Sequence, residues 1–288
     1  MTTRTSTAIA TAADRWRQGT VAAGALVAMA GAAWGSGAFG GTAIADAAGG
    51  ALAADATLLA PASPAFGIWS AIYVALALFA GVQALPSRAT DPRMRSVSWW
   101  ILASMVLNAA WIGVVQAGWL WASVLIIAVL VAVLGMVARR LTLTDAANPL
   151  DLAATEITVG LYLGWSAVAT VANVAAAGRD AVGADAAEGT LAAILALAVV
   201  SVIAATMAVA LRWRPALAMS AGLAMAWGLG WIAAGRAEGD PHNIAVMWAA
   251  GVAAAIAFAA PFAAFDFRRD HRLEPVDLTD EDVSQRRA

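Results

Sequence analysis

The decisive stretch of the sequence runs from Ser96 to Ala138 and reads SVSWWILASMVLNAAWIGVVQAGWLWASVLIIAVLVAVLGMVA. None of its 43 residues is charged. As one helix it would be about 64 Å long at 1.5 Å per residue, about twice the thickness of a bilayer's hydrocarbon core. It must therefore fold back on itself, and Gly118 is the most plausible turn. The stretch predicts two consecutive transmembrane helices.

The same pattern continues along the chain, which is 62% hydrophobic. Six further uncharged windows of 21 to 32 residues are 18–45, 56–87, 157–178, 189–211, 215–235 and 241–265. Each is long enough to cross a bilayer as a helix. We therefore predict an all-α, polytopic transmembrane helix bundle of about eight spans, at 19–41, 65–85, 97–117, 120–138, 153–177, 189–211, 216–235 and 243–266.

The arginines provide an independent test of this topology, because cytoplasmic loops retain basic residues. The chain has no Lys, and eight spans with an inside N-terminus place fifteen Arg inside and only Arg179 and Arg236 outside. This predicts a multi-pass cell-membrane protein with both termini cytoplasmic. The N-terminus also resembles a secretory signal, but its apolar run continues to Thr42, which favours a retained first span.

The segments outside the spans differ in character. Residues 1–18 form a polar cytoplasmic lead and residues 268–288 a charged cytoplasmic tail. Residues 42–64 are too apolar for a solvated linker, and long loops of this kind are typically lids, binding loops or disordered. Gly31 and Gly35 are four residues apart, a spacing that lets two helices approach closely. We interpret it as ordinary packing within the bundle, and a homodimer contact is the alternative.

Composition excludes several kinds of site. The absence of Cys excludes disulfides and thiolate metal sites, and the absence of Lys excludes a retinal Schiff base. His242 and His271 lie in a loop and the tail, so neither can be a buried haem ligand. Glu156 and Asp266 lie near span ends, where their carboxylates are expected to reach the headgroups. We predict no metal site, no catalytic residue, no required cofactor and no nucleic-acid partner; the expected surroundings are the lipid bilayer.

Uncharged polar and aromatic residues share helix faces inside the spans. The fifth span places four residues within roughly 80° of arc, at offsets 0, 3, 7 and 11: Tyr162, Trp165, Ala169 and Asn173. Two further pairs share faces at spacings of three and four: Asn108 with Trp111, and Trp69 with Tyr73. Because amides in a membrane need partners, we expect Asn108 and Asn173 to face protein or a cavity.

The thirteen Trp divide into two groups. Those at predicted span ends fit the aromatic belt of membrane proteins: Trp16, Trp99, Trp100, Trp119, Trp121 and Trp213. The others lie deeper in the spans: Trp34, Trp69, Trp111, Trp165, Trp227, Trp231 and Trp248. For these, packing or lipid contact competes with a ligand pocket as the explanation.

The segment from Pro61 to Asn173 resembles the translocator protein family, also called tryptophan-rich sensory proteins or TspO/MBR. The resemblance rests on prolines before Trp69 and Tyr73, on Leu107 and Asn108 followed by Trp111, and on the fifth-span stripe of Tyr162, Trp165, Ala169 and Asn173. The chain departs from the family at Leu161, where a Pro is usual. The resemblance implies a five-helix membrane domain at 19–177, with three additional helices at 178–267.

The resemblance also implies a function. Such proteins bind porphyrins, haem and related apolar ligands in an aromatic pocket, which makes a tetrapyrrole-like molecule the expected partner. It implies a lid at 42–64 and these wall residues: Trp69, Tyr73, Asn108, Trp111, Tyr162, Trp165, Ala169 and Asn173. Sensing, regulation and transport all remain open, with a passive or exchange small-molecule transporter as the alternative. Tetrapyrrole degradation ranks lowest, because the predicted pocket lacks a titratable group.

Overall fold

The protein is described from a computed structural model, which covers residues 9–35 and 42–270. All regular structure in these residues is helical: α1 (Ala12–Gly35), α2 (Ile68–Ala84), α3 (Pro92–Gln116), α4 (Leu120–Thr142), the short α5 (Pro149–Leu152), α6 (Thr158–Val182), α7 (Thr190–Ala210), α8 (Pro215–Glu238) and α9 (Ile244–Asp270). A π-helical turn, η4 (Ala153–Ile157), joins α5 to α6. Short 3-10 turns lie at Ala47–Gly50, Ser63–Gly67 and Pro86–Arg88. The all-α prediction is confirmed, and seven helical segments of the described chain are long and apolar enough to cross a membrane.

The predicted turn within the long uncharged stretch is also confirmed. Gly118 separates α3 from α4 and has a φ of +77°, a conformation that only Gly adopts without strain. At its other end α3 begins with Pro92, which suits the first helical position because it lacks an N–H. The Asp91 carboxylate accepts hydrogen bonds from the backbone N–H groups of Arg93 and Met94, at 2.8 and 3.4 Å.

The first helix begins earlier than the predicted span, at Ala12 rather than residue 19. Thr11 and Asp14 bond each other's backbone N–H groups, as in a capping box, and so start the helix inside the polar lead. Arg95 donates two 2.6 Å hydrogen bonds to Asp14, which hold the pKa of that carboxyl well below its usual value. α1 packs along α2 and α3 but is not among the seven segments that are long and apolar enough to cross a membrane. The last six residues of the predicted first span, 36–41, lie outside the described residues.

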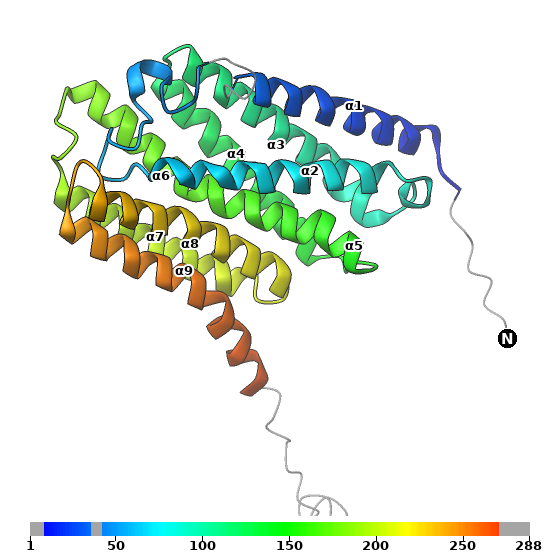
Figure 1. Ribbon diagram of the computed structural model, residues 1–288. Helices are drawn as coiled ribbons and strands as arrows, with labels where there is room; N and C mark the ends of the chain where they lie inside the picture. The colour runs from blue at the N-terminus through cyan, green and yellow to red at the C-terminus, as the bar shows by residue number, and fades with distance from the viewer. Residues whose placement is uncertain (1–8, 36–41, 271–288) are drawn as a thin grey trace, which may run out of the picture.

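The helices lie roughly side by side and alternate in direction (Figure 1). The α2–α3, α4–α5 and α7–α8 connections share one end of the bundle with the start of α1; we call this the arginine end. The α1–α2 loop and the α3–α4, α6–α7 and α8–α9 connections share the other, the loop end. Arg179 and Arg236 lie toward the loop end, as the alternation predicts.

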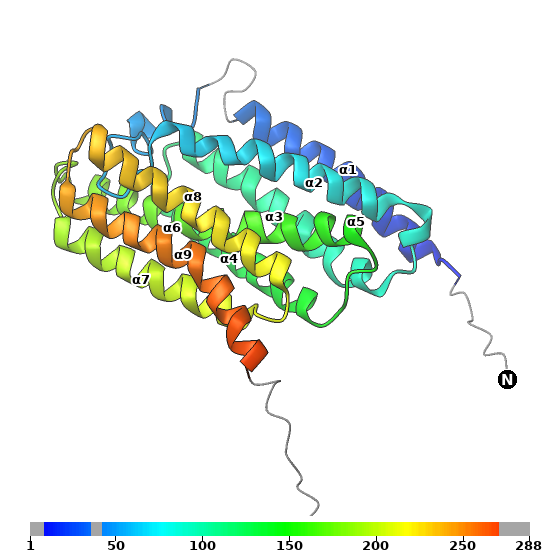
Figure 2. The same ribbon diagram turned by 60° about the horizontal axis from the view of Figure 1, so that its bottom comes forward.

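The helices after α6 join the first part through α8, which packs between α6 and α9 (Figure 2). A Cβ at Gly160 would lie 2.6 Å from the Leu217 carbonyl oxygen, and one at Gly164 only 2.1 Å from that of Ala221. These distances leave no room for a side chain, so the two backbones meet directly. α7 completes the bundle by packing on α9.

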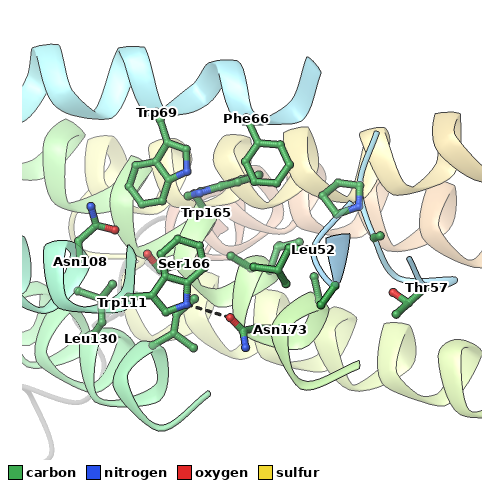
Figure 3. Close-up of a pocket in the computed structure, with 17 residues that line it drawn as sticks. Leu52, Thr57, Phe66, Trp69, Asn108, Trp111, Leu130, Trp165, Ser166 and Asn173 are labelled. Atoms are coloured by element: carbon green, nitrogen blue, oxygen red, sulfur yellow. Dashed lines mark hydrogen bonds between the residues drawn. The ribbon is translucent and has the colours of Figure 1, made fainter. Parts of the chain in front are cut away.

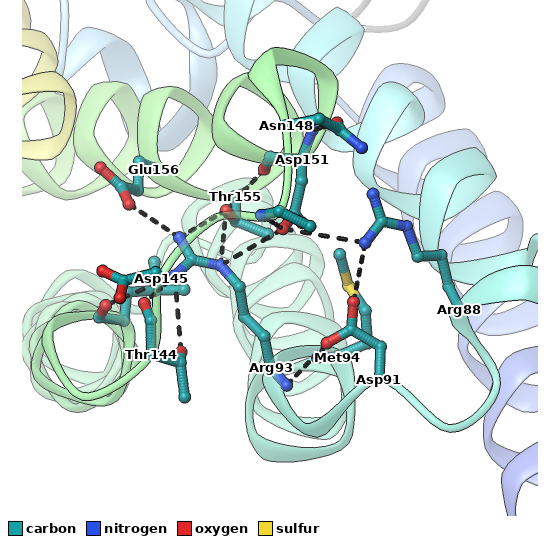
Figure 4. Close-up of polar contacts among 12 residues, drawn as sticks. Arg88, Asp91, Arg93, Met94, Thr144, Asp145, Asn148, Asp151, Thr155 and Glu156 are labelled. Atoms are coloured by element: carbon teal, nitrogen blue, oxygen red, sulfur yellow. Dashed lines mark hydrogen bonds and ion pairs between the residues drawn. The ribbon is translucent and has the colours of Figure 1, made fainter. Parts of the chain in front are cut away.

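A buried ion-pair cluster closes the arginine end (Figure 4). The Arg93 guanidinium donates 2.9 Å hydrogen bonds to Glu156 and to the Thr155 hydroxyl, and also bonds the Thr144 carbonyl. Arg214 from the start of α8 lies 3.9 Å from Glu156 and pairs with Asp145 at 2.6 Å. Glu156 is 2% exposed, so the expectation that its carboxylate reaches headgroups is wrong. The widened η4 turn lies in the middle of this cluster.

Candidate functional site

A small cavity lies among α2, α3, α4 and α6 and is covered by the loop 42–64 (Figure 3). We call it the aromatic cavity. Its volume is about 40 Å³, enough for a few water molecules but too small for a drug-sized ligand. Six of the eight predicted wall residues line it: Trp69, Asn108, Trp111, Trp165, Ala169 and Asn173. The helical stripes derived from spacing therefore do converge on one place.

Packed aromatic rings form one wall of this cavity. Trp165 meets Phe66 and Trp69 edge to face, with ring centroids 6.0 and 6.2 Å apart. Trp69 in turn stacks on Tyr73 at 5.5 Å and 23°. Such geometries are favourable for π systems, so the wall is a preformed surface for another flat apolar group.

Asn173 holds three helices together. Its carbonyl oxygen accepts a 2.9 Å hydrogen bond from the Trp111 indole of α3, and its amide donates a 2.8 Å bond to Ser123 of α4. The dashed line in Figure 3 marks the first of these bonds. Asn173 thus has a partner for both ends of its amide, and its contribution is chiefly to the shape of the cavity.

Other polar groups on the wall are not satisfied by the protein. Among the described residues, four buried lining atoms have no hydrogen-bond partner: Thr57 Oγ1, Asn108 Oδ1, Trp165 Nε1 and Ser166 Oγ. Asn108 uses only its amide, which donates to the Tyr73 hydroxyl at 3.2 Å. Buried polar atoms without a partner in the protein are rare and costly, and the few water molecules that the cavity can hold are one source of partners for these four.

A second cavity of about 440 Å³ adjoins the first; we call it the flanking cavity. Phe66, Trp69 and Trp111 line both, so these side chains form the partition. Tyr73 lines only the flanking cavity. Tyr162 lines neither: it is fully buried, and its hydroxyl donates to the Ser104 carbonyl at 3.0 Å. Of these two adjoining cavities, the flanking cavity has a volume within the roughly 300–1,000 Å³ of small-molecule sites, and the aromatic cavity does not.

The loop over the cavity is held by α8. Arg236 is fully buried and donates to the backbone carbonyls of Thr57, Ala54 and Asp240 at 2.6, 2.7 and 3.0 Å. The Trp227 indole donates to the Ala65 carbonyl at 2.9 Å, and the Trp231 carbonyl accepts from the Ala62 N–H at 3.1 Å. The indole contact gives Trp227 a role that the motifs left open, and the Trp231 ring packs edge to face on Trp227 with centroids 5.7 Å apart. Arg236 was predicted to lie just beyond the span 216–235; it belongs to the last turn of α8 and is buried.

Several lining residues carried no usable signal in the sequence. Thr57 belongs to the segment 42–64 that was predicted as a lid and Phe66 to the start of the predicted span 65–85, but no pattern distinguished either from its neighbours. Ile127 and Leu130 come from the middle of α4, which is apolar on every side from Val124 to Ala138, so the sequence pattern does not show which side faces inward. Ser166 directly follows Trp165, so the period of the fifth-span stripe omits it.

A family model described as "TSPO-like protein" matches residues 20–263. The chain belongs to the TSPO-like family. The match runs from α1 into α9, beyond the five spans that carry the motifs, so α7 and α8 fall inside it too. No curated protein and no solved structure matches the chain. This TSPO-like protein is a multi-pass membrane protein whose family motifs lie around the aromatic cavity and its partition.

Proposed function

We propose that this TSPO-like protein binds a planar apolar ligand, such as a porphyrin or haem, for sensing, regulation or transport. The observation that carries the proposal is the set of unsatisfied atoms at Thr57, Asn108, Trp165 and Ser166 beside an aromatic wall. A tetrapyrrole would offer a flat apolar face to the rings and polar edge groups to these atoms.

Binding requires the site to enlarge, because the aromatic cavity measures only about 40 Å³. Rotation of Phe66 or Trp69 would join it to the flanking cavity of about 440 Å³. Displacement of the loop segment around Thr57 would open it on another side. The proposal therefore predicts that the ligand is bound in a rearranged aromatic partition.

The test is a titration of protoporphyrin into the purified protein in nanodiscs, followed through the porphyrin absorbance and not only through Trp quenching. Wild-type protein should bind saturably. The double variant Asn108→Leu, Trp165→Phe should bind at least about tenfold more weakly, since it removes one acceptor, one donor and part of the ring wall. Trp248→Phe is the matched control, because Trp248 is 67% exposed on α9. Absence of saturable binding to the wild type would refute the proposal.

A passive or exchange transporter is the second candidate, and one contact favours it. Thr57 lines both the aromatic cavity and a groove on the far side of the loop, so a movement of this segment would connect the two. Liposome flux that is lost in the Asn108→Leu, Trp165→Phe variant would support transport through the cavity. We propose no catalytic role, and porphyrin recovered unchanged after illumination with the protein is the expected result.

A further inference from the structure

A groove of about 450 Å³ lies between α6 and α7, on the side of the loop away from the aromatic cavity; we call it the lateral groove. α6 packs on α8 and α7 on α9, so the facing sides of α6 and α7 do not close on each other. Leu58 and Leu59 of the loop also line the groove. On α6, Val174 and Val182 line it while 44% and 76% exposed, so the groove opens toward the surroundings of the bundle.

The lining of the lateral groove is aliphatic. α7 contributes Ala192, Ala193 and Ala196, α6 contributes Val171 and Ala175, and no lining residue is aromatic. The aromatic cavity, in contrast, has four aromatic side chains in its wall. A flexible alkyl chain can fill such a smooth channel, whereas a flat ring would find no stacking surface.

The uncharged part of the groove spans about two thirds of one leaflet of a membrane. Along α6 the groove runs from Val171 to Val182, eleven steps or about 16 Å at 1.5 Å per residue, and its uncharged part from Val171 to Gly178 is about 10 Å long. A bilayer core is about 30 Å thick, so one leaflet contributes about 15 Å. The groove ends at the α6–α7 connection, which lies at the loop end of the bundle.

Charges gather only at that end. Arg179, Asp185 and Glu188 line the groove there, and the remaining lining residues are uncharged. Arg179 uses its Nε to bond the Ala184 carbonyl at 3.1 Å, which fixes its guanidinium beside the connection. One cation and two carboxylates complement a headgroup that carries both a phosphate and an amine.

We propose that the lateral groove binds one acyl chain of a zwitterionic membrane lipid, with its phosphate at Arg179 and its amine at Asp185 and Glu188. The lipid comes from the leaflet on the loop side of the bundle. This site is separate from the aromatic cavity and does not depend on a ligand being bound there.

The test measures which lipids stay with the protein after extraction from nanodiscs of equal phosphatidylethanolamine and phosphatidylglycerol content, by native mass spectrometry. Gly178→Leu is the blocking variant: Gly178 lines the groove, and a Cβ there meets nothing within 4 Å, so the side chain fills the channel without disturbing packing. Wild-type protein should retain phosphatidylethanolamine over phosphatidylglycerol, and Gly178→Leu should retain at least fivefold less. The double variant Asp185→Asn, Glu188→Gln should abolish the preference, because only phosphatidylethanolamine carries the amine, while Arg179→Gln should weaken retention of both lipids, because both carry the phosphate.

Gly113→Leu is the control for the added side chain, because Gly113 also lies on a helix with open space at its Cβ but outside the groove. Arg139→Gln controls for the lost charge at an exposed site. Both should behave like wild type, and circular dichroism should show all variants folded. Equal lipid retention by Gly178→Leu and wild type, or no preference in the wild type, would overturn the proposal. Unchanged porphyrin titration of Gly178→Leu separates this result from the test of the aromatic cavity.

Discussion

Asn108 and Asn173 are both amides buried among the helices, yet they make different contacts. Both ends of the Asn173 amide form hydrogen bonds, to Trp111 and Ser123, whereas the side-chain carbonyl oxygen of Asn108 has no partner in the protein. Spacing predicted that both face protein or a cavity, and this is confirmed. Spacing alone could not separate them, because the partner on α4, Ser123, belongs to no motif.

The difference predicts effects of different size for two substitutions. Asn173→Ala breaks two interhelical hydrogen bonds and should destabilise the protein by about 1–2 kcal/mol. Asn108→Leu removes only one protein hydrogen bond and an unsatisfied oxygen, so its effect on stability should be smaller. Unfolding in mixed micelles measures both. Equal losses would show that the free oxygen of Asn108 has no bearing on the site.

Glu156 is the second residue whose role follows from its contacts. Glu156→Gln leaves the buried guanidinium of Arg93 without its hydrogen-bonded carboxylate, and loss of one member of such a pair typically costs about 3–5 kcal/mol. The double variant Arg93→Met, Glu156→Met should lose less than Glu156→Gln, because no charge is left unpaired between these positions. Glu188→Gln, at an exposed site, is the control. Thermal unfolding that ranks the double variant below Glu156→Gln would contradict this account.

At the scale of the element, α6 meets the backbone of α8 at two glycines, which carry no side chain. Gly164→Ala places a methyl 2.1 Å from the Ala221 carbonyl oxygen and should separate the helices, at a cost of a few kcal/mol. Gly178→Ala, on the same helix, meets open space and should stabilise it by about 0.5–1 kcal/mol. Opposite shifts in melting temperature for these two changes are the expected result. Shifts of the same sign would argue against direct backbone packing.

The loop is the second element whose behaviour depends on α8. Arg236→Gln removes most of the hydrogen bonds that hold the carbonyls of Ala54 and Thr57. Amide exchange around residues 54–58 should then be at least about tenfold faster, since local opening no longer breaks these bonds. Exchange in α4 should not change, and Arg212→Gln, which bonds only its own helix end, should behave like wild type. If amide exchange in the loop of Arg236→Gln is the same as in the wild type, Arg236 does not hold the loop in place.

At the scale of the whole molecule, the sequence predicted most of the helices but little of how they pack against one another. Uncharged windows report where a chain can leave water, so they located α2, α3, α4, α6, α7, α8 and α9 and the turn at Gly118, but not the short α5. They carry no information on which helix lies beside which, and so the packing of α8 on α6 was not predicted. Arg236 shows the same limit, because its partners are backbone carbonyls, which any sequence offers.

The side of the membrane that each end faces is a prediction with a direct test. Because the chain has no Cys, single cysteines can be placed without a background. Ser87 is exposed at the arginine end and Ala187 is exposed at the loop end, so the test uses the variants Ser87→Cys and Ala187→Cys. An impermeant maleimide should label Ala187→Cys in intact cells and Ser87→Cys only after lysis, as the arginine bias requires. The reverse pattern would invert the topology.

The bare contact at Gly160 and Gly164 also affects how this family can be read from sequence. Two positions four residues apart on α6 accept no side chain because α8 lies on them. A chain that stops after its fifth span has nothing there to collide with and can place larger residues. In an alignment sorted by chain length, we therefore expect glycine at both positions in the longer members and larger residues in the shorter ones. Glycine at these two positions would then identify the chains that have a helix equivalent to α8.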